Sequence, residues 1–233
     1  MDEILDEKRK MKKIIIIGDN EFAEIASVYF AKDYGYETVA FAVEKEYKQK
    51  KEILGIPVVE YEEIKRLFNP SEYFFFAAPV YTKLNRLRQR FYEQCKSWGY
   101  KPVSYVSPHA FVWENVQIGE NTFIFEDNTV QYNVKIGNNV ILWSGNHIGH
   151  SAVIEDNCFV SSHVVISGYT RIGNNSFLGV NSTLGNNIVF PEESILAAGA
   201  VVCKTFVEGG CIYAGNPAKK LNKTSYEYFG IEK

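Results

Sequence analysis

The stretch VKIGNNVILWSGNHIGHSAVIEDNCFVSSHVVISGYTRIG, residues 134–173, repeats one pattern every six residues. Starting from Ile136, each sixth position carries a large aliphatic residue. The same frame continues on both sides, and all 17 such positions from Val106 to Val202 are apolar. If about half of the residues of an ordinary chain are apolar, a run of this length arises by chance about once in 100,000 trials. The period is therefore a property of the fold.

A period of six fits neither a helix nor a flat strand, but it fits a coil of three short strands joined by turns, the parallel β-helix. We expect the aliphatic residues to point inward and to stack on their counterparts one coil, or three repeats, away. Glycine or asparagine in the motifs IGEN and IGNN is expected to take positive φ in the turns. An ordinary β-sandwich would instead show a period of two with variable turns. No insertion interrupts the array, so an active site must lie on its flat sides or between copies of it.

The residues before this array follow a different pattern. IIIIG, ETVAFAV and YFFFAA are typical of buried strands, and they alternate with helical stretches, which indicates a parallel sheet. The sequence therefore predicts a small α/β Rossmann-like N-terminal domain, then a parallel β-helix of hexapeptide repeats and a short C-terminal helix. We expect the domains to span residues 12–105, 106–220 and 221–233, with residues 1–10 as an extension.

Composition limits the possible partners and the compartment. The chain has 233 residues, a net charge of -3 and no long basic block, which argues against a nucleic acid or an anionic membrane as the main partner. The four cysteines show no CxxC spacing, and no apolar run is long enough for a signal peptide or a membrane helix. We expect a cytoplasmic protein with reduced cysteines.

Histidines cluster inside the repeat. The chain has four histidines, and His147, His150 and His163 fall within 17 residues. In the repeat frame His147 and His150 take turn or outward positions, where histidine is either a solvated residue or a group that moves a proton near neutral pH. Asn146 occupies a corner position that usually holds a small residue, and we include it among the candidate catalytic residues.

The array, followed by YAGNPAKKL, resembles the hexapeptide-repeat acyltransferases that have a left-handed parallel β-helix. With the α/β domain in front, residues 12–220 are most similar to bacterial nucleotide-sugar N-acetyltransferases of the bacillosamine and perosamine type and to sialic-acid O-acetyltransferase-like proteins. The resemblance implies an acyl-CoA-dependent homotrimer that transfers an acetyl or similar acyl group to the amino group of a nucleotide-linked amino sugar in surface-glycan biosynthesis. Sugar O-acetylation, or a non-catalytic trimer that binds a nucleotide sugar, remains an alternative.

The resemblance also implies roles for single residues. His150, in HIGHSAVIE, takes the position of the general base, and Gly168, one coil later, takes the position whose N–H binds the oxyanion. The carboxylate that follows the histidine in the bacillosamine-type enzymes is replaced by Ser151, so Glu155 or Asp156 would have to serve or the base has no such partner. His147 is assigned to the acceptor. The residues expected to contact acetyl-CoA are Phe159, which replaces a family histidine, Gly168, Val180, Ala198, Gly199 and Lys219, with Lys220 as an alternative to Lys219.

In these relatives the turn after the first strand receives the nucleotide sugar. The matching residues here are Gly18, Asn20, Glu21 and Phe22, in the sequence GDNEFAE. Acidic side chains beside a pyrophosphate are unfavourable, so a tight turn that only packs the sheet is the alternative. The dinucleotide fingerprint GxGxxG is absent, which argues against an NAD enzyme.

A zinc site of the carbonic anhydrase type would need three convergent histidines. The separations between the clustered histidines are 3, 13 and 16 positions, and none of these is a whole coil of three repeats. We therefore expect no metal.

Overall fold

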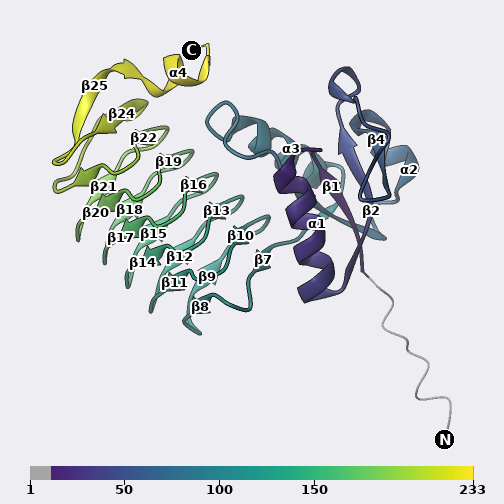
Figure 1. Cartoon of the computed structure of the whole chain (residues 1–233), viewed down its shortest axis with the longest axis horizontal. Helices are drawn as coiled ribbons and strands as arrows, with labels where there is room; N and C mark the ends of the chain where they lie inside the picture. The colour runs from purple at the N-terminus through teal and green to yellow at the C-terminus, as the bar shows by residue number, and fades with distance from the viewer. Residues whose placement is uncertain (1–11, 233) are drawn as a thin grey trace, which may run out of the picture. The chain divides into compact units, whose positions relative to one another are not determined.

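The computed structural model describes residues 12–232, so the expected extension at residues 1–10 and the final residue, 233, lie outside the described part. The described chain forms two compact units, residues 12–78 with 94–102 and residues 79–93 with 103–232 (Figure 1). Within residues 12–232 no helix has both the length and the hydropathy needed to cross a membrane. The predicted fold class is confirmed: a small α/β domain, a left-handed parallel β-helix and a short C-terminal helix.

The first unit contains a six-stranded sheet in the order β3-β4-β2-β1-β5-β6. All neighbouring pairs are parallel except β3 and β4. Ile14 to Ile17 of β1 are fully buried, as the run of β-branched residues predicts. The elements are β1 (Lys12–Ile17), α1 (Glu21–Tyr34), β2 (Tyr36–Val43), η1 (Lys45–Tyr47), β3 (Glu52–Ile53), β4 (Ile56–Glu60), η2 (Tyr61–Glu63), α2 (Ile64–Leu67), β5 (Tyr73–Ala77), α3 (Arg86–Ser97, grouped with this unit from Gln94) and β6 (Lys101–Pro102).

Helix α1 is capped at both ends by its sequence. The Asn20 side chain accepts a hydrogen bond of 2.9 Å from the Ala23 N–H, and Gly35 ends the helix at φ 67°. Asparagine is a favoured N-cap and glycine is the usual residue for a left-handed C-cap. In the turn after β1, the Asn20 side chain therefore already caps the start of α1.

The second unit is a three-sided prism of stacked coils (Figure 1). Each strand pairs in parallel with its counterpart in the next coil, as β10 does with β13. Face 1 consists of β7 (Tyr105–Val106), β10 (Phe123–Ile124), β13 (Ile141–Leu142), β16 (Phe159–Val160), β19 (Phe177–Leu178), β22 (Ile195–Leu196), β24 (Cys211–Ala214) and β25 (Lys219–Thr224). Face 2 consists of β8 (Phe111–Val112), β11 (Thr129–Val130), β14 (His147–Ile148), β17 (Val165–Ile166), β20 (Thr183–Leu184) and β23 (Val201–Val202). Face 3 consists of β9 (Gln117–Ile118), β12 (Lys135–Ile136), β15 (Val153–Ile154), β18 (Arg171–Ile172) and β21 (Val189–Phe190).

The six-residue frame describes the core of the prism. Residues of the frame such as Ile148 and Ile166 are fully buried, and they form one cluster with the small corner residues. The register is fixed by the alternation of inward and outward side chains, because a slip by one residue would turn every aliphatic group toward solvent. The predicted stacking between successive coils is confirmed by pairs such as Ile148 and Ile166.

The turns take positive φ at the asparagine of the motifs, one of the two residue types predicted, and not at the glycine. Between Asn121 and Gly199 the third residue after each inward aliphatic has φ between 52° and 76°, so the second asparagine of IGNN adopts this conformation. The glycine directly after the aliphatic does not. It is required by close approach instead: a Cβ on Gly149 would lie 2.6 Å from the Gly168 nitrogen in the next coil. The expectation for these glycines was therefore wrong about the cause.

Face 1 is covered by residues 79–93 and by the end of the chain. Tyr81 lies edge-on to Phe159 and Phe177, at ring-centroid distances of 5.0 and 5.3 Å, and Leu84 is fully buried in a cluster with Ile195. The expected boundary at residue 105 assigns these residues to the first domain, whereas they pack on the coils.

Two arginines of α3 dock this segment on the coils: Arg86 is paired with Glu193, and Arg88 is buried. Arg88 is 1% exposed and donates to the backbone oxygens of Asn139 (2.9 Å) and Asn121 (2.7 Å). Burial lowers the pKa of its guanidinium to about 9. The asparagine side chains beneath it form a ladder, in which Asn121 donates to Asn139 and Asn139 donates to Asn157.

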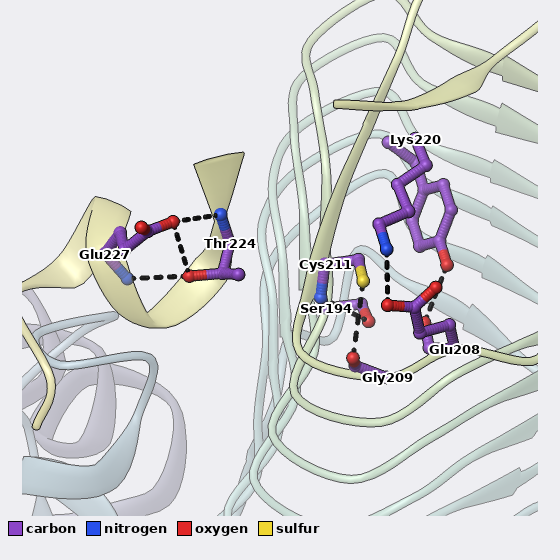
Figure 2. Close-up of polar contacts among 8 residues, drawn as sticks. Ser194, Glu208, Gly209, Cys211, Lys220, Thr224 and Glu227 are labelled. Carbon is purple, nitrogen blue, oxygen red and sulfur yellow. Dashed lines mark hydrogen bonds and ion pairs between the residues drawn. The ribbon is translucent and has the colours of Figure 1, made fainter. Parts of the chain in front are cut away.

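Several polar contacts hold the C-terminal segment: the Ser225 hydroxyl donates to the Glu193 carbonyl, and the Ser225 N–H donates 3.0 Å to the Gly210 carbonyl. Lys220 of β25 is paired with Glu208, and the cap of α4 (Ser225–Phe229) is a capping box between Thr224 and Glu227 (Figure 2). The capping box satisfies two backbone groups at the helix start. This segment therefore has a defined structure beside the last coils.

Candidate functional site

His150 lies at the corner between faces 2 and 3, which we call the His150 corner and define by residues 132–133, 150–151, 168–169 and 186–187. Its side chain is exposed, and its backbone N–H donates 3.0 Å to the Gln131 side-chain oxygen. The ring is edge-on to Tyr169, with centroids 4.9 Å apart and an interplanar angle of 85°. Sequence analysis did not identify Tyr169, although its position directly after Gly168 places it at the same corner of the next coil.

Gly168 is directly against the His150 ring. A Cβ at Gly168 would lie 2.7 Å from both Cε1 and Nε2 of His150, so the imidazole occupies the space that a side chain would need. Gly168 is buried, and among residues 12–232 no acceptor bonds its N–H. The spacing of one coil thus brings together the two groups that were predicted to act as base and oxyanion donor. A free N–H of this kind is suited to stabilise a developing negative charge.

His147 is on β14 and projects from face 2. It pairs in register with Thr129 and Val165, and its side chain is half-buried. It lies on the same coil as His150, on the flat side rather than at the corner. Its predicted contact with the acceptor stays a prediction.

Asn146 is not placed where it can act on a substrate. It is 1% exposed, its side-chain oxygen accepts 2.7 Å from the Val164 N–H, and its amide donates to the Trp143 carbonyl. Both polar ends of the side chain are therefore used to hold the corner between two coils. The structure gives Asn146 a role in the turn.

The two acids suggested as partners of His150 are engaged elsewhere. Glu155 is paired with Arg171 and accepts from the Asn174 N–H, while Asp156 accepts from the Asn138 N–H at 2.7 Å. Ser151 stands at φ 55° in the turn, and its hydroxyl accepts 3.3 Å from Asn133. No carboxylate contact to His150 is present in the described structure.

A pocket of about 610 Å³ lies over the last coils of the second unit. Its walls are mostly apolar and include Val180 and Ala198, two of the residues predicted to contact acetyl-CoA. Gly199 is next to this lining in the turn, at φ 67°. Phe159 does not line it, because its ring is 4% exposed and stacks on Phe177 at 5.3 Å. The pocket also has walls that the repeat motif did not indicate: Tyr81, Leu221, Tyr228 and Phe229.

The basic residue at this pocket is Lys223. Of the lysines considered from the sequence, Lys220 is paired with Glu208 (Figure 2), and Lys219 is exposed on β25 and does not line the pocket. Lys223 lines it, and its ammonium lies 5.4 Å from the ring centroid of Tyr228. No sequence motif marks this lysine, because the fold of the C-terminal segment brings it to the pocket.

In the first unit, some of the residues predicted to contact the nucleotide are already used in packing or capping. Phe22 is 4% exposed and packs on Phe76, and the Asn20 side chain is used as the helix cap. Gly18 has φ 123°, and Glu21 is exposed in the first turn of α1. The Gly18 N–H donates 2.8 Å to the Ala42 carbonyl, so of the four residues only Glu21 presents a side chain that the unit itself does not already use.

Among residues 12–232 there is no group of three or more histidine, cysteine, aspartate or glutamate residues that could hold a metal ion.

Comparison with known proteins supports the repeat and the fold. The family model for bacterial transferase hexapeptide (six repeats) matches residues 133–168. A mutant of perosamine N-acetyltransferase from Caulobacter crescentus, in complex with CoA and GDP-perosamine, has a similar fold, with a TM-score of 0.82 over 91% of this chain and 97% of that chain at 22% identity. The predicted resemblance to hexapeptide-repeat sugar acetyltransferases is confirmed for the repeat and the fold.

Curated relatives share the repeat region. Gamma carbonic anhydrase 1, mitochondrial, from Arabidopsis thaliana is 30% identical over 138 residues, which cover 53% of this chain and 50% of the relative. GDP-perosamine N-acetyltransferase from Escherichia coli O157:H7 is 24% identical over 146 residues, covering 60% of this chain and 65% of the relative. The chain thus spans about half to two thirds of the length of these relatives.

Proposed function

We propose that this protein is an acyl-CoA-dependent acyltransferase that transfers an acetyl group to the amine of a nucleotide-linked amino sugar, with His150 as the general base. The observation that carries the proposal is the contact between the His150 imidazole and Gly168, whose N–H is free for an oxyanion. The relatives named for GDP-perosamine acetylation, and the neighbour structure with CoA and GDP-perosamine, support this choice of substrates.

The reaction needs a group that accepts a proton and a hydrogen-bond donor that stabilises the oxyanion. His150 takes a proton from the attacking amine as the nitrogen bonds to the thioester carbonyl carbon, and the carbonyl oxygen becomes an oxyanion. The Gly168 N–H donates to this oxyanion. The C–S bond then breaks, and the proton held by His150 passes to the departing thiolate. Products are the amide and free CoA, so atoms and charge balance without any other reactant.

The positions of the base and the pocket support a site shared between copies. The four residues 146–149 separate the His150 corner from the opposite edge of face 2, a distance of about 13 Å at about 3.3 Å per residue. Val180 lies at that opposite edge two coils further on, which adds about 10 Å along the axis at about 4.8 Å per coil. A contact between two different edges closes into a ring of identical copies, and the resemblance indicates three.

The first experiment is thiol release from acetyl-CoA with a panel of UDP-, dTDP- and GDP-linked amino sugars. We expect turnover with one sugar, a loss of about 100-fold in His150→Ala, the scale for losing a general base, and wild-type activity in the matched control His163→Ala. Activity that survives in His150→Ala would refute the assignment of the base. Turnover only with hydroxyl acceptors would favour O-acylation, and binding without turnover would favour the non-catalytic alternative. Zinc content and CO₂ hydration test the activity named for the plant relative.

A mixing experiment tests the shared site. His150→Ala removes the base, and Ala198→Trp fills the pocket from an exposed position. If base and pocket come from different copies, mixed trimers at equal ratio regain about one quarter of the wild-type sites, because each site then needs two independent intact contributions. No recovery after unfolding and refolding the mixture would show that each chain builds its own site. Sedimentation of the wild type checks for a trimer.

A further inference from the structure

Exposed aromatic side chains gather around His150. Tyr169 is 61% exposed, Tyr132 is 58% exposed and Trp113 is 44% exposed. Tyr132 stands one coil before His150 and contacts Trp113 at a centroid distance of 6.5 Å, while Tyr169 stands beside Gly168 one coil after it. Single exposed apolar residues are ordinary, but several exposed aromatic rings on neighbouring coils beside a candidate catalytic group favour a binding surface.

Tyr169 occupies its place against its backbone preference. Its φ is 58°, the left-handed conformation that the turns of this prism assign mainly to asparagine, as at Asn133 and Asn187 in the same corner. A bulky residue is unfavourable there, and strain that persists next to a candidate catalytic group indicates a role for the side chain. The ring does not repay this strain by burial, because most of it faces solvent.

The Tyr169 ring lies directly beside the His150 imidazole. The Tyr169 N–H donates 3.0 Å to the His150 carbonyl, and the edge-on ring contact of 4.9 Å confines the imidazole from one side while Gly168 leaves room on another. A molecule that approaches His150 from this side therefore lies beside the Tyr169 ring. Tyrosine offers an apolar face and a hydroxyl that forms hydrogen bonds, which matches a sugar ring with its C–H faces and hydroxyl groups.

We propose that Tyr169, with Tyr132 on the other side of His150, binds the hexose ring of the acceptor and so determines its specificity. This inference rests on the proposed function, since it concerns the acceptor of that same reaction. Tyr169 forms the wall next to the base, and Tyr132 forms the wall one coil earlier.

The test compares Tyr169→Asn with His163→Asn. Both replace an exposed ring at a φ of 58° or 59° by asparagine, the residue favoured in these turns, so both variants should fold with at least wild-type thermal stability. Only Tyr169→Asn should raise KM for the amino-sugar nucleotide and weaken its equilibrium binding, by about tenfold or more, the range for losing one stacking partner. KM for acetyl-CoA should stay unchanged in both, and Tyr132→Ala should show the same pattern as Tyr169→Asn.

Calorimetric binding of the same UDP-, dTDP- and GDP-linked amino sugars separates this inference from the proposed function. Binding that weakens in Tyr169→Asn without any turnover by the wild type would support the subsite and refute the reaction. Turnover with an unchanged acceptor KM in Tyr169→Asn would refute the subsite and leave the reaction standing. Two further results would overturn the subsite: no binding of any of these sugars, or a change of oligomeric state in Tyr169→Asn, which would place the ring in a contact between copies.

Discussion

Gly168→Ala is the substitution that tests the catalytic geometry most directly. The new Cβ would lie 2.7 Å from Cε1 and Nε2 of His150, whereas carbon atoms in contact are normally about 3.5 to 4.0 Å apart. The imidazole must therefore move by about 1 Å, and a displacement of that size at a reacting group costs about 100-fold in rate. This corresponds to about 2.7 kcal/mol of transition-state stabilisation.

The same substitution should change stability little. Gly168 is not among the residues with positive φ, so alanine fits its backbone conformation, and the exposed His150 side chain is free to turn into solvent. We expect the free energy of unfolding to change by less than about 1 kcal/mol. Thermal unfolding of the variant measures this beside kcat, so a catalytic loss can be separated from misfolding.

The control and the double variant define the result that would refute this reasoning. Gly145→Ala creates a similar clash at another corner, where its Cβ would lie 2.6 Å from the His163 ring; because Gly145 has φ 76°, this variant should lose stability but leave kcat unchanged. In thiol-release assays Gly168→Ala combined with His150→Ala should be no slower than His150→Ala alone, because both changes act through one imidazole. A wild-type kcat in Gly168→Ala, or a further loss in the double variant, would contradict the assignment.

Four further outcomes follow from the second unit. Lys223→Ala should raise KM for acetyl-CoA about five- to tenfold with kcat unchanged, if Lys223 pairs with a CoA phosphate, and the difference should then shrink at high salt. Burial raises the pKa of the Cys158 thiol to about 12. The free energy of unfolding should therefore fall as pH rises from about 9 to about 12, because in this range only the unfolded chain loses the thiol proton. Urea titrations at each pH should show a shallower fall in Cys158→Ala. In native protein Ellman's reagent should titrate Cys203, the exposed cysteine, rapidly and Cys158 only after unfolding. Arg88→Met should lower the free energy of unfolding by about 2 to 4 kcal/mol, because the Asn139 and Asn121 carbonyls lose a buried donor; a change below about 0.5 kcal/mol in urea titration would contradict this.

The sequence predicted what the repeat determines. A strict six-residue frame fixes the register, and a fixed register places His150 and Gly168 in adjacent coils at the same corner, so their contact could be inferred from a spacing of three repeats. The family resemblance, rather than the frame, indicated Val180 and Ala198, and both line one pocket.

Contacts outside the frame could not be predicted in this way. The covering of face 1 by Tyr81 and the presence of Lys223 at the pocket depend on segments that lack the repeat. Asn146 was misjudged because its polar side chain suggested chemistry, whereas the corner needs an acceptor for the Val164 N–H. The turn glycines were misjudged because packing between coils, not φ, excludes a side chain at Gly149.

The uniform stacking of coils also makes the prism a molecular ruler. Inserting one whole coil between the coil of Gly168 and the last coil would add one layer of about 4.8 Å, leaving the geometry on each side of the new layer unchanged. Inserting a segment that is not a whole number of coils would shift the faces and expose the aliphatic frame. The span between His150 and the C-terminal pocket can therefore change only in whole layers, and under the proposed function the number of layers between them sets the length of the ligand that reaches both.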